Sequence, residues 1–201
     1  MRHWLRTRTA WWALLATGLL PLAWLVGRTW ADQLGANPAE TLIRATGDWA
    51  IRGLCITLAV TPLRTVLGWP ELARFRRLLG LLTFAYACLH LLCYAVFDMG
   101  LDWADIAKDV AKRPFILVGF SAMLVLLALA ATSFNRVIRW LGAARWQALH
   151  RAVYAAAVLA VLHFWWMRSG KRLYGEVLVY AAILAVLLGW RVLRRLKKRS
   201  H

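Results

Sequence analysis

The chain has 201 residues, of which 62% are hydrophobic and 17% charged, and its formal net charge is +17. A soluble domain is roughly half apolar and about a quarter charged, so this composition indicates a membrane protein and leaves no room for a sizeable soluble domain. The basic residues flank apolar runs instead of lining one polar face, which argues for contact with membrane lipid and against nucleic acid as a partner.

Six apolar runs follow one another, each close to the about 20 residues that a helix needs to cross a bilayer. They cover residues 10–29, 49–67, 78–97, 114–133, 147–167 and 175–193. The first run follows a basic start and is interpreted as a retained helix, not a cleaved signal peptide. We therefore expect an all-α membrane protein, a six-transmembrane-helix bundle that forms one domain over residues 1–201.

The loops and their charges predict the orientation of this bundle. Residues 30–48 contain the chain breakers Gly35, Pro38 and Gly47 and are expected to form an outer loop. Residues 98–113 are expected to form a short interfacial helix. If both termini are cytoplasmic, the inner segments hold 17 of the 26 basic residues and only one of the nine acidic residues. The positive-inside rule therefore predicts a multi-pass protein with both termini in the cytoplasm.

Three histidines, His90, His150 and His163, lie within these apolar runs. An ionisable residue is costly to place in a membrane helix, so each is either a hydrogen-bonded packing residue or a functional group. In the predicted topology, His90 and His163 both lie about 20 Å from the inner face, on helices that run from inside to outside. Two imidazoles at a common depth bind a haem iron from both sides. We therefore predict a haem b held by His90 and His163.

His150 is placed near the inner face, where its role stays open. Thirteen residues rotate an ideal helix by roughly 220°, so His150 and His163 point apart unless the helix bends. The start of the third helix offers no histidine to pair with His150. Either another residue completes a second haem site, or His150 binds a propionate, a flavin or a quinone. Arg77 and Arg151 are candidate contacts for haem propionates or lipid headgroups.

The chain shows no nucleotide-binding motif and no catalytic triad, so we expect it to carry electrons with no catalytic residue of its own. Several short motifs then point to a known family. In chain order these are LGANPAE at 34–40, Thr46-Gly47, TPLR at 61–64, RRLLG at 76–80, Leu89-His90 with Tyr94, KRPF at 112–115 and LGAARWQALHRAVY at 141–154. Together with the three histidines they resemble the MsrQ (YedZ) family of ferric-reductase-like transmembrane proteins.

This resemblance implies a b-type haem protein of the bacterial inner membrane with His90, His150 and His163 as haem-associated residues. It implies electron transfer from the quinone pool, or from a flavin reductase, to a periplasmic molybdopterin-dependent methionine-sulfoxide reductase, MsrP, which repairs oxidised periplasmic proteins. It also implies FMN as a cofactor, although no motif marks its site. The alternatives are a stand-alone ferric reductase, a cytochrome-b561-like electron carrier, or a small proton-coupled transporter.

Overall fold

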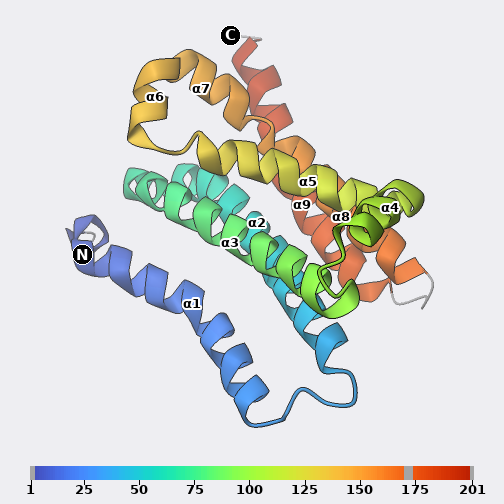
Figure 1. Cartoon of the computed structure of the whole chain (residues 1–201). Helices are drawn as coiled ribbons and strands as arrows, with labels where there is room; N and C mark the ends of the chain where they lie inside the picture. The colour runs from blue at the N-terminus through green and yellow to red at the C-terminus, as the bar shows by residue number, and fades with distance from the viewer. Residues whose placement is uncertain (1–2, 170–173, 200–201) are drawn as a thin grey trace. The chain divides into compact units, whose positions relative to one another are not determined.

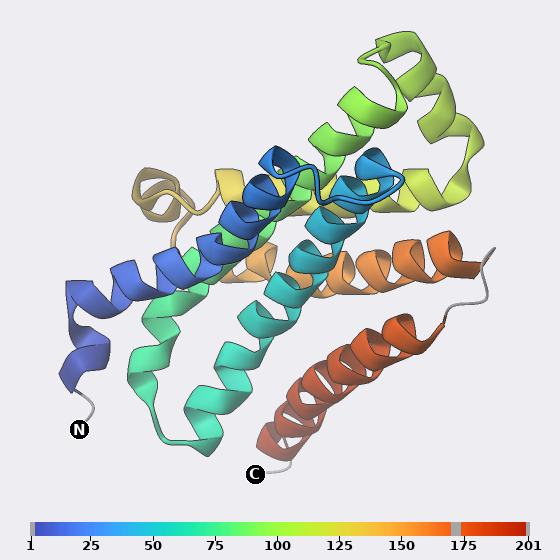
Figure 2. The same ribbon diagram turned by 90° about the horizontal axis from the view of Figure 1, so that it is seen from below.

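The structure is a computed structural model that describes residues 3–169 and 174–199, with side chains described as far as residue 197. Every regular element in these ranges is helical, which confirms the all-α prediction. The chain divides into two compact units, Met1–Asp102 and Trp103–His201 (Figures 1 and 2). We call them unit 1 and unit 2 and describe each by itself.

Unit 1 contains three long helices and three short helical segments. In chain order they are η1 (His3–Arg6), α1 (Arg8–Trp30), α2 (Pro38–Val66), η2 (Pro70–Phe75), α3 (Arg76–Cys93) and the π-helical turn η3 (Tyr94–Asp98). Helices α2 and α3 lie side by side and antiparallel (Figure 2). Their interface includes a hydrogen bond of 3.3 Å between the hydroxyls of Thr57 and Thr83. Small and hydroxyl-bearing residues let the two backbones approach closely, as in other membrane helix pairs.

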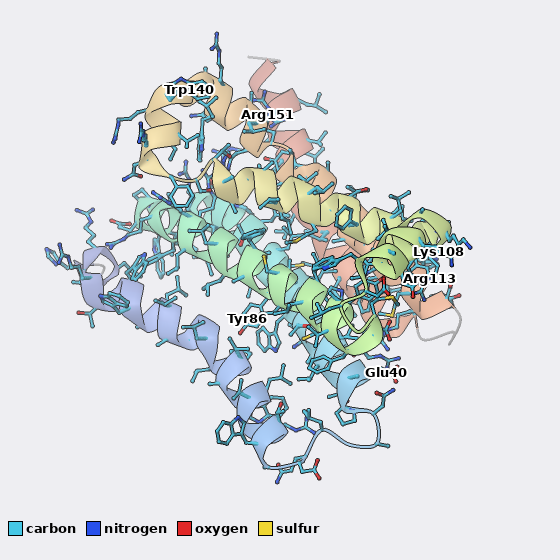
Figure 3. All side chains as sticks on the ribbon, viewed as in Figure 1. Glu40, Tyr86, Lys108, Arg113, Trp140 and Arg151 are labelled. Atoms are coloured by element: carbon cyan, nitrogen blue, oxygen red, sulfur yellow. The ribbon has the colours of Figure 1, made fainter. Side chains whose placement is uncertain are left out.

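Helix α1 is joined to α3 beside its internal proline. Pro21 lies inside α1. The buried Tyr86 hydroxyl donates to the carbonyl oxygen of Gly18 at 2.8 Å and accepts from the N–H of Leu22 at 3.2 Å. These are the two backbone groups that an undistorted helix would pair with each other. Tyr86 therefore points from α3 to α1 and satisfies both groups (Figure 3).

The N-terminal segment is held against η2 by charge and by apolar packing. Arg6 forms an ion pair of 2.7 Å with Glu71, and Arg74 donates to the carbonyl of Leu5 at 3.1 Å. Leu5 and Phe75 are both buried in a small apolar cluster beneath these contacts. The start of α1 is thus connected to the turn between α2 and α3.

Unit 2 contains six helices within its described residues. They are α4 (Trp103–Lys112), α5 (Pro114–Ala131), α6 (Asn135–Leu141), α7 (Ala143–His150), α8 (Val153–Ser169) and α9 (Gly175–Arg199). Helix α8 packs against both α5 and α9. Ala156 and Ala157 are fully buried, and Arg168 near the end of α8 forms an ion pair of 3.0 Å with Glu176 of α9. Helix α8 is therefore the central element of unit 2 (Figure 1).

Five helical segments in the described ranges are long and apolar enough to cross a membrane. They are Arg8–Trp30, Pro70–Asp98, Pro114–Ala131, Ala143–Ser169 and Gly175–Lys197. Few residues of these segments are buried within the chain, at most 22% of the most apolar stretch of each, and the others are partly or fully exposed. Such exposed apolar surface is suited to lipid tails. Helix α2 is not among the five, because Arg44, Asp48 and Arg52 lie in its first half.

Two predicted boundaries are wrong. The segment 30–48 is not a loop throughout, because α2 begins at Pro38, where the side chain of Asn37 caps the helix by accepting from the Glu40 N–H at 3.1 Å. Gly47 therefore lies inside a helix and does not break it. The run 147–167 is not one helix, because α7 ends at His150 and α8 begins at Val153. The short helix predicted within 98–113 is present as α4.

Candidate functional site

In unit 1, His90 lies near the end of α3 and is half-buried. Its Nδ1 atom is 2.8 Å from the carbonyl oxygen of Ile43 in α2. A carbonyl oxygen only accepts hydrogen bonds, so Nδ1 must carry a proton and donate it. In the neutral ring, the lone pair is then on Nε2. The neighbouring helix thus selects the tautomer of this histidine.

In unit 2, His163 has the same arrangement. It is half-buried in α8, and its Nδ1 donates to the carbonyl oxygen of Phe115 in α5 at 2.7 Å. The Phe115 ring also stacks near the imidazole, with ring centroids 6.3 Å apart. The lone pair of the neutral His163 ring is therefore on Nε2 as well.

A glycine lies directly beneath each of these rings. A Cβ atom added to Gly47 would be 3.0 Å from Nδ1 of His90, and one added to Gly119 would be 2.7 Å from Nδ1 of His163. Contacts below 3.4 Å are tighter than ordinary van der Waals packing. Each imidazole therefore occupies space that exists only because the facing residue has no side chain.

These two histidines fit the chemistry of haem ligands. A histidine that binds a metal through one ring nitrogen almost always donates the other ring N–H to a carbonyl or carboxylate, which fixes its orientation and makes it a stronger ligand. His90 and His163 each have that second interaction in place. Each unit thus supplies one imidazole whose Nε2 carries the lone pair when the ring is neutral, and such a nitrogen is the donor atom that a haem iron takes from proteins.

His150 is held differently. Its Nε2 is 3.1 Å from the hydroxyl of Thr132, which also lies 2.7 Å from the carbonyl oxygen of Ala128. The Thr132 hydroxyl donates to Nε2 or accepts from it according to the tautomer of the ring. The Trp146 indole stacks on this imidazole at 4.0 Å between centroids and donates to the Thr132 carbonyl at 2.9 Å. His150 is thus bonded through Nε2, whereas His163 is bonded through Nδ1.

Within unit 2, the two histidines lie at opposite ends of the α5–α8 pair. His163 contacts Phe115 at the start of α5, whereas His150 contacts Thr132, the residue that follows its end. The two histidines are thus separated along the α5–α8 pair, and a turn at residues 151–152 lies between them.

The two candidate arginines are both exposed. Arg77 lies in the first turn of α3, about 20 Å along the helix from His90, so it does not adjoin that ring. Arg151 follows His150 directly, at the turn between α7 and α8 (Figure 3). Of these two side chains, Arg151 alone is next to a predicted histidine in the sequence and the structure.

Several residues of the site were missed by sequence reasoning. They are the carbonyl-bearing Ile43 and Phe115, the glycines Gly47 and Gly119, and the partners of His150, Thr132 and Trp146. Backbone carbonyls leave no mark in a sequence. A glycine inside a helical run is a signal for a close approach by another group, and Gly47 was assigned to a loop instead.

Comparison with known proteins identifies the family. Residues 46–161, more than half of the chain, match the family described as ferric reductase like transmembrane component. A protein of Polaromonas naphthalenivorans is 65% identical over 174 residues, which cover 87% of this chain and 80% of that protein. Its name is protein-methionine-sulfoxide reductase heme-binding subunit MsrQ. The chain belongs to the MsrQ family.

Other MsrQ proteins show the same relation. A relative from Ralstonia nicotianae is 52% identical, covering 92% of this chain and 84% of its own length. One from Herminiimonas arsenicoxydans is 50% identical, with 93% and 86% covered. No solved structure matches this chain. The resemblance inferred from the motifs is confirmed, and with its apolar helices this MsrQ-family chain is a multi-pass integral membrane protein.

Proposed function

We propose that this chain is the haem-binding, electron-transferring membrane subunit of a methionine-sulfoxide reductase system. The observation that carries the proposal is the pair of half-buried imidazoles, His90 and His163, each with Nδ1 bonded to a carbonyl of the adjacent helix. The names of the MsrQ relatives and the ferric-reductase-like match support it. In this proposal the chain transfers electrons, and the reduction of methionine sulfoxide takes place on a partner protein.

The proposed cofactor is one haem b with His90 and His163 as its axial ligands. When bound, the haem supplies a one-electron iron couple in a medium of low dielectric constant. The chain's part is to present two Nε2 lone pairs and to hold the Nδ1 protons on the carbonyls of Ile43 and Phe115. These hydrogen bonds stiffen both rings and increase their donor strength. If His90 and His163 both held the iron, no coordination position would stay open, which would favour electron transfer over oxygen activation.

We further propose a second haem at His150, which a count of haems per chain would test. His150 would bind the iron through Nε2 only after losing its bond to Thr132. Arg151 is the proposed contact for a propionate there, and Arg77 the proposed contact for a lipid headgroup at the start of α3. FMN is proposed as a cofactor on the family resemblance alone.

The proposed topology is a bundle of six transmembrane helices with both termini in the cytoplasm, in the bacterial inner membrane. Helix α2 would be the sixth span in addition to the five apolar segments. The polar first half of α2 is compatible with a span for two reasons. Arg44 pairs with Glu40, and Gly47 and Gly53 pack closely against α3. The excess of basic residues in the predicted inner segments supports cytoplasmic termini.

The proposed electron path begins at the quinone pool, or at a flavin reductase, and ends at the periplasmic molybdopterin-dependent reductase MsrP. A stand-alone ferric reductase is the second candidate, favoured by the description of the matching family. The two candidate functions are distinguished by mixing dithionite-reduced protein either with MsrP and methionine sulfoxide or with a ferric chelate. Reoxidation that requires MsrP supports the first function, and rapid reoxidation by the chelate alone supports the second.

The haem proposal is tested by a reduced-minus-oxidised absorption spectrum of the detergent-purified protein, with haem measured per chain. We expect a b-type α band that His90→Ala and His163→Ala abolish or greatly weaken. His3→Ala is the matched control, because His3 is an exposed histidine in η1. A full b-type spectrum in both ligand variants would contradict the ligand assignment. A colourless wild-type protein from haem-replete cells would contradict the function and favour a transporter.

A further inference from the structure

The two candidate ligands share one local device, which we call the histidine seat. It consists of a helix carbonyl that accepts the Nδ1 proton and a glycine four residues later that lies under the ring. In unit 1 the seat is Ile43 and Gly47, and in unit 2 it is Phe115 and Gly119. The same spacing occurs in two units that fold from different parts of the chain.

The geometry of the α-helix explains why the carbonyl and the glycine are four residues apart. Side chains in a helix point toward its N-terminus, so the side chain of residue i+4 lies over the carbonyl of residue i. That carbonyl already accepts the N–H of residue i+4, and a side chain there would cover its remaining lone pair. A glycine leaves the carbonyl open, so an imidazole from a neighbouring helix is able to reach it.

We propose that Gly47 and Gly119 are positioning residues that set the tautomer and the orientation of the haem-ligating histidines. This inference rests on the proposed haem function of His90 and His163. The glycines touch neither the haem nor its iron in this proposal. They act through the histidine ring, by allowing it to sit low enough on α2 or α5 to donate to the carbonyl.

The distances predict which of the two glycine substitutions has the larger effect. An alanine Cβ at residue 119 would lie 2.7, 2.8 and 3.0 Å from three atoms of the His163 ring, so that ring must shift by about 0.7 Å to reach the 3.4 Å of ordinary contact. At residue 47 the two nearest atoms of His90 are 3.0 and 3.1 Å away, and the required shift is about 0.4 Å. Gly119→Ala should therefore perturb its histidine more than Gly47→Ala.

The expected effect follows from the role of the outer hydrogen bond. Loss of such a partner typically lowers metal affinity by about 10–100-fold. We expect Gly119→Ala to weaken haem retention within this range and Gly47→Ala to weaken it less. Haem that remains should show a higher reduction potential, because an imidazole without the carbonyl bond donates less charge and stabilises the ferric state less.

Gly53→Ala is the matched control for a clash between the same two helices. Its Cβ would lie 2.7 Å from the hydroxyl of Thr83, in the α2–α3 interface but about two turns of α3 from His90. Gly189→Ala, with nothing within 4 Å, controls for the change in helix propensity. All four variants and the wild type are purified in detergent, and haem per chain, reduction potential and helical circular dichroism are measured.

The seat is supported if both seat variants lose haem or shift the potential upward while the two controls keep wild-type values. Wild-type haem content and potential in Gly119→Ala and Gly47→Ala would overturn it and leave the proposed function intact. An equal loss in Gly53→Ala would also overturn it, in favour of general helix packing. If Gly119→Ala does not fold, the milder Gly47→Ala decides between the positioning role and general helix packing. A haem-free wild type would instead refute the proposed function itself.

Discussion

The hydroxyl of Tyr86 offers a sharp test of how α1 is held to α3. In Tyr86→Phe the ring and its tilted contact with Trp49, 6.2 Å between centroids, are preserved, and only the hydroxyl is removed. The carbonyl of Gly18 then loses a donor at 2.8 Å, and the N–H of Leu22 loses an acceptor at 3.2 Å. The substitution therefore isolates two hydrogen bonds at the position next to Pro21.

The expected change in the free energy of unfolding follows from these two hydrogen bonds. Side-chain hydrogen bonds between membrane helices contribute on average about 0.6 kcal/mol each and at most about 1.7. Leaving a buried backbone group unsatisfied costs about 1–3 kcal/mol, although the Gly18 carbonyl and the Leu22 N–H recover part of this if they pair with each other. We therefore expect Tyr86→Phe to lower the free energy of unfolding by about 1–2 kcal/mol.

The assay is a double-mutant cycle with Pro21→Ala, in which the equilibrium unfolding of each variant is measured in mixed detergent micelles. Alanine at residue 21 restores an N–H for the helix and removes the proline ring, so the pair Gly18–Leu22 closes more easily without the tyrosine hydroxyl. The cost of Tyr86→Phe should therefore be smaller in the Pro21→Ala background. An unchanged free energy of unfolding in Tyr86→Phe, or the same cost in both backgrounds, would refute the bridging role of the hydroxyl.

Three further predictions follow from other contacts. Asn37→Ala should lower the free energy of unfolding by about 1 kcal/mol through loss of the α2 cap, whereas Asn37→Asp should not, as measured by the same unfolding assay. Thr132→Val should leave the haem of His90 and His163 unchanged in a haem count, because it removes only the hydroxyl that binds His150; a loss of all haem would contradict separate sites. A C-terminal fusion should be fluorescent with green fluorescent protein and inactive with alkaline phosphatase, and the reverse would contradict cytoplasmic termini.

Hydrophobic runs located the long helices well, because a transmembrane span is a property of consecutive residues. They failed at the start of α2, where residues 38–48, with the expected chain breakers Pro38 and Gly47, were assigned to a loop. The capping pattern of Asn37 with Glu40 was present in the sequence and was the better guide to this start. The break at residues 151–152 left no such pattern, because Thr132, the partner of both His150 and Trp146, lies far away in the chain, directly after α5.

The sequence by itself determined the class of protein, the identity of the three intramembrane histidines and the family. Composition, hydropathy and the order of short motifs are properties of the sequence, and they are evident without any knowledge of packing. The tautomers of His90 and His163 were decided only by the tertiary structure. Nδ1 of His90 and of His163 donates to Ile43 and to Phe115 because α2 and α5 lie beside these rings. Whether such a carbonyl is open depends on the residue four positions further on. Such contacts join residues far apart in the chain, so no window of sequence contains them.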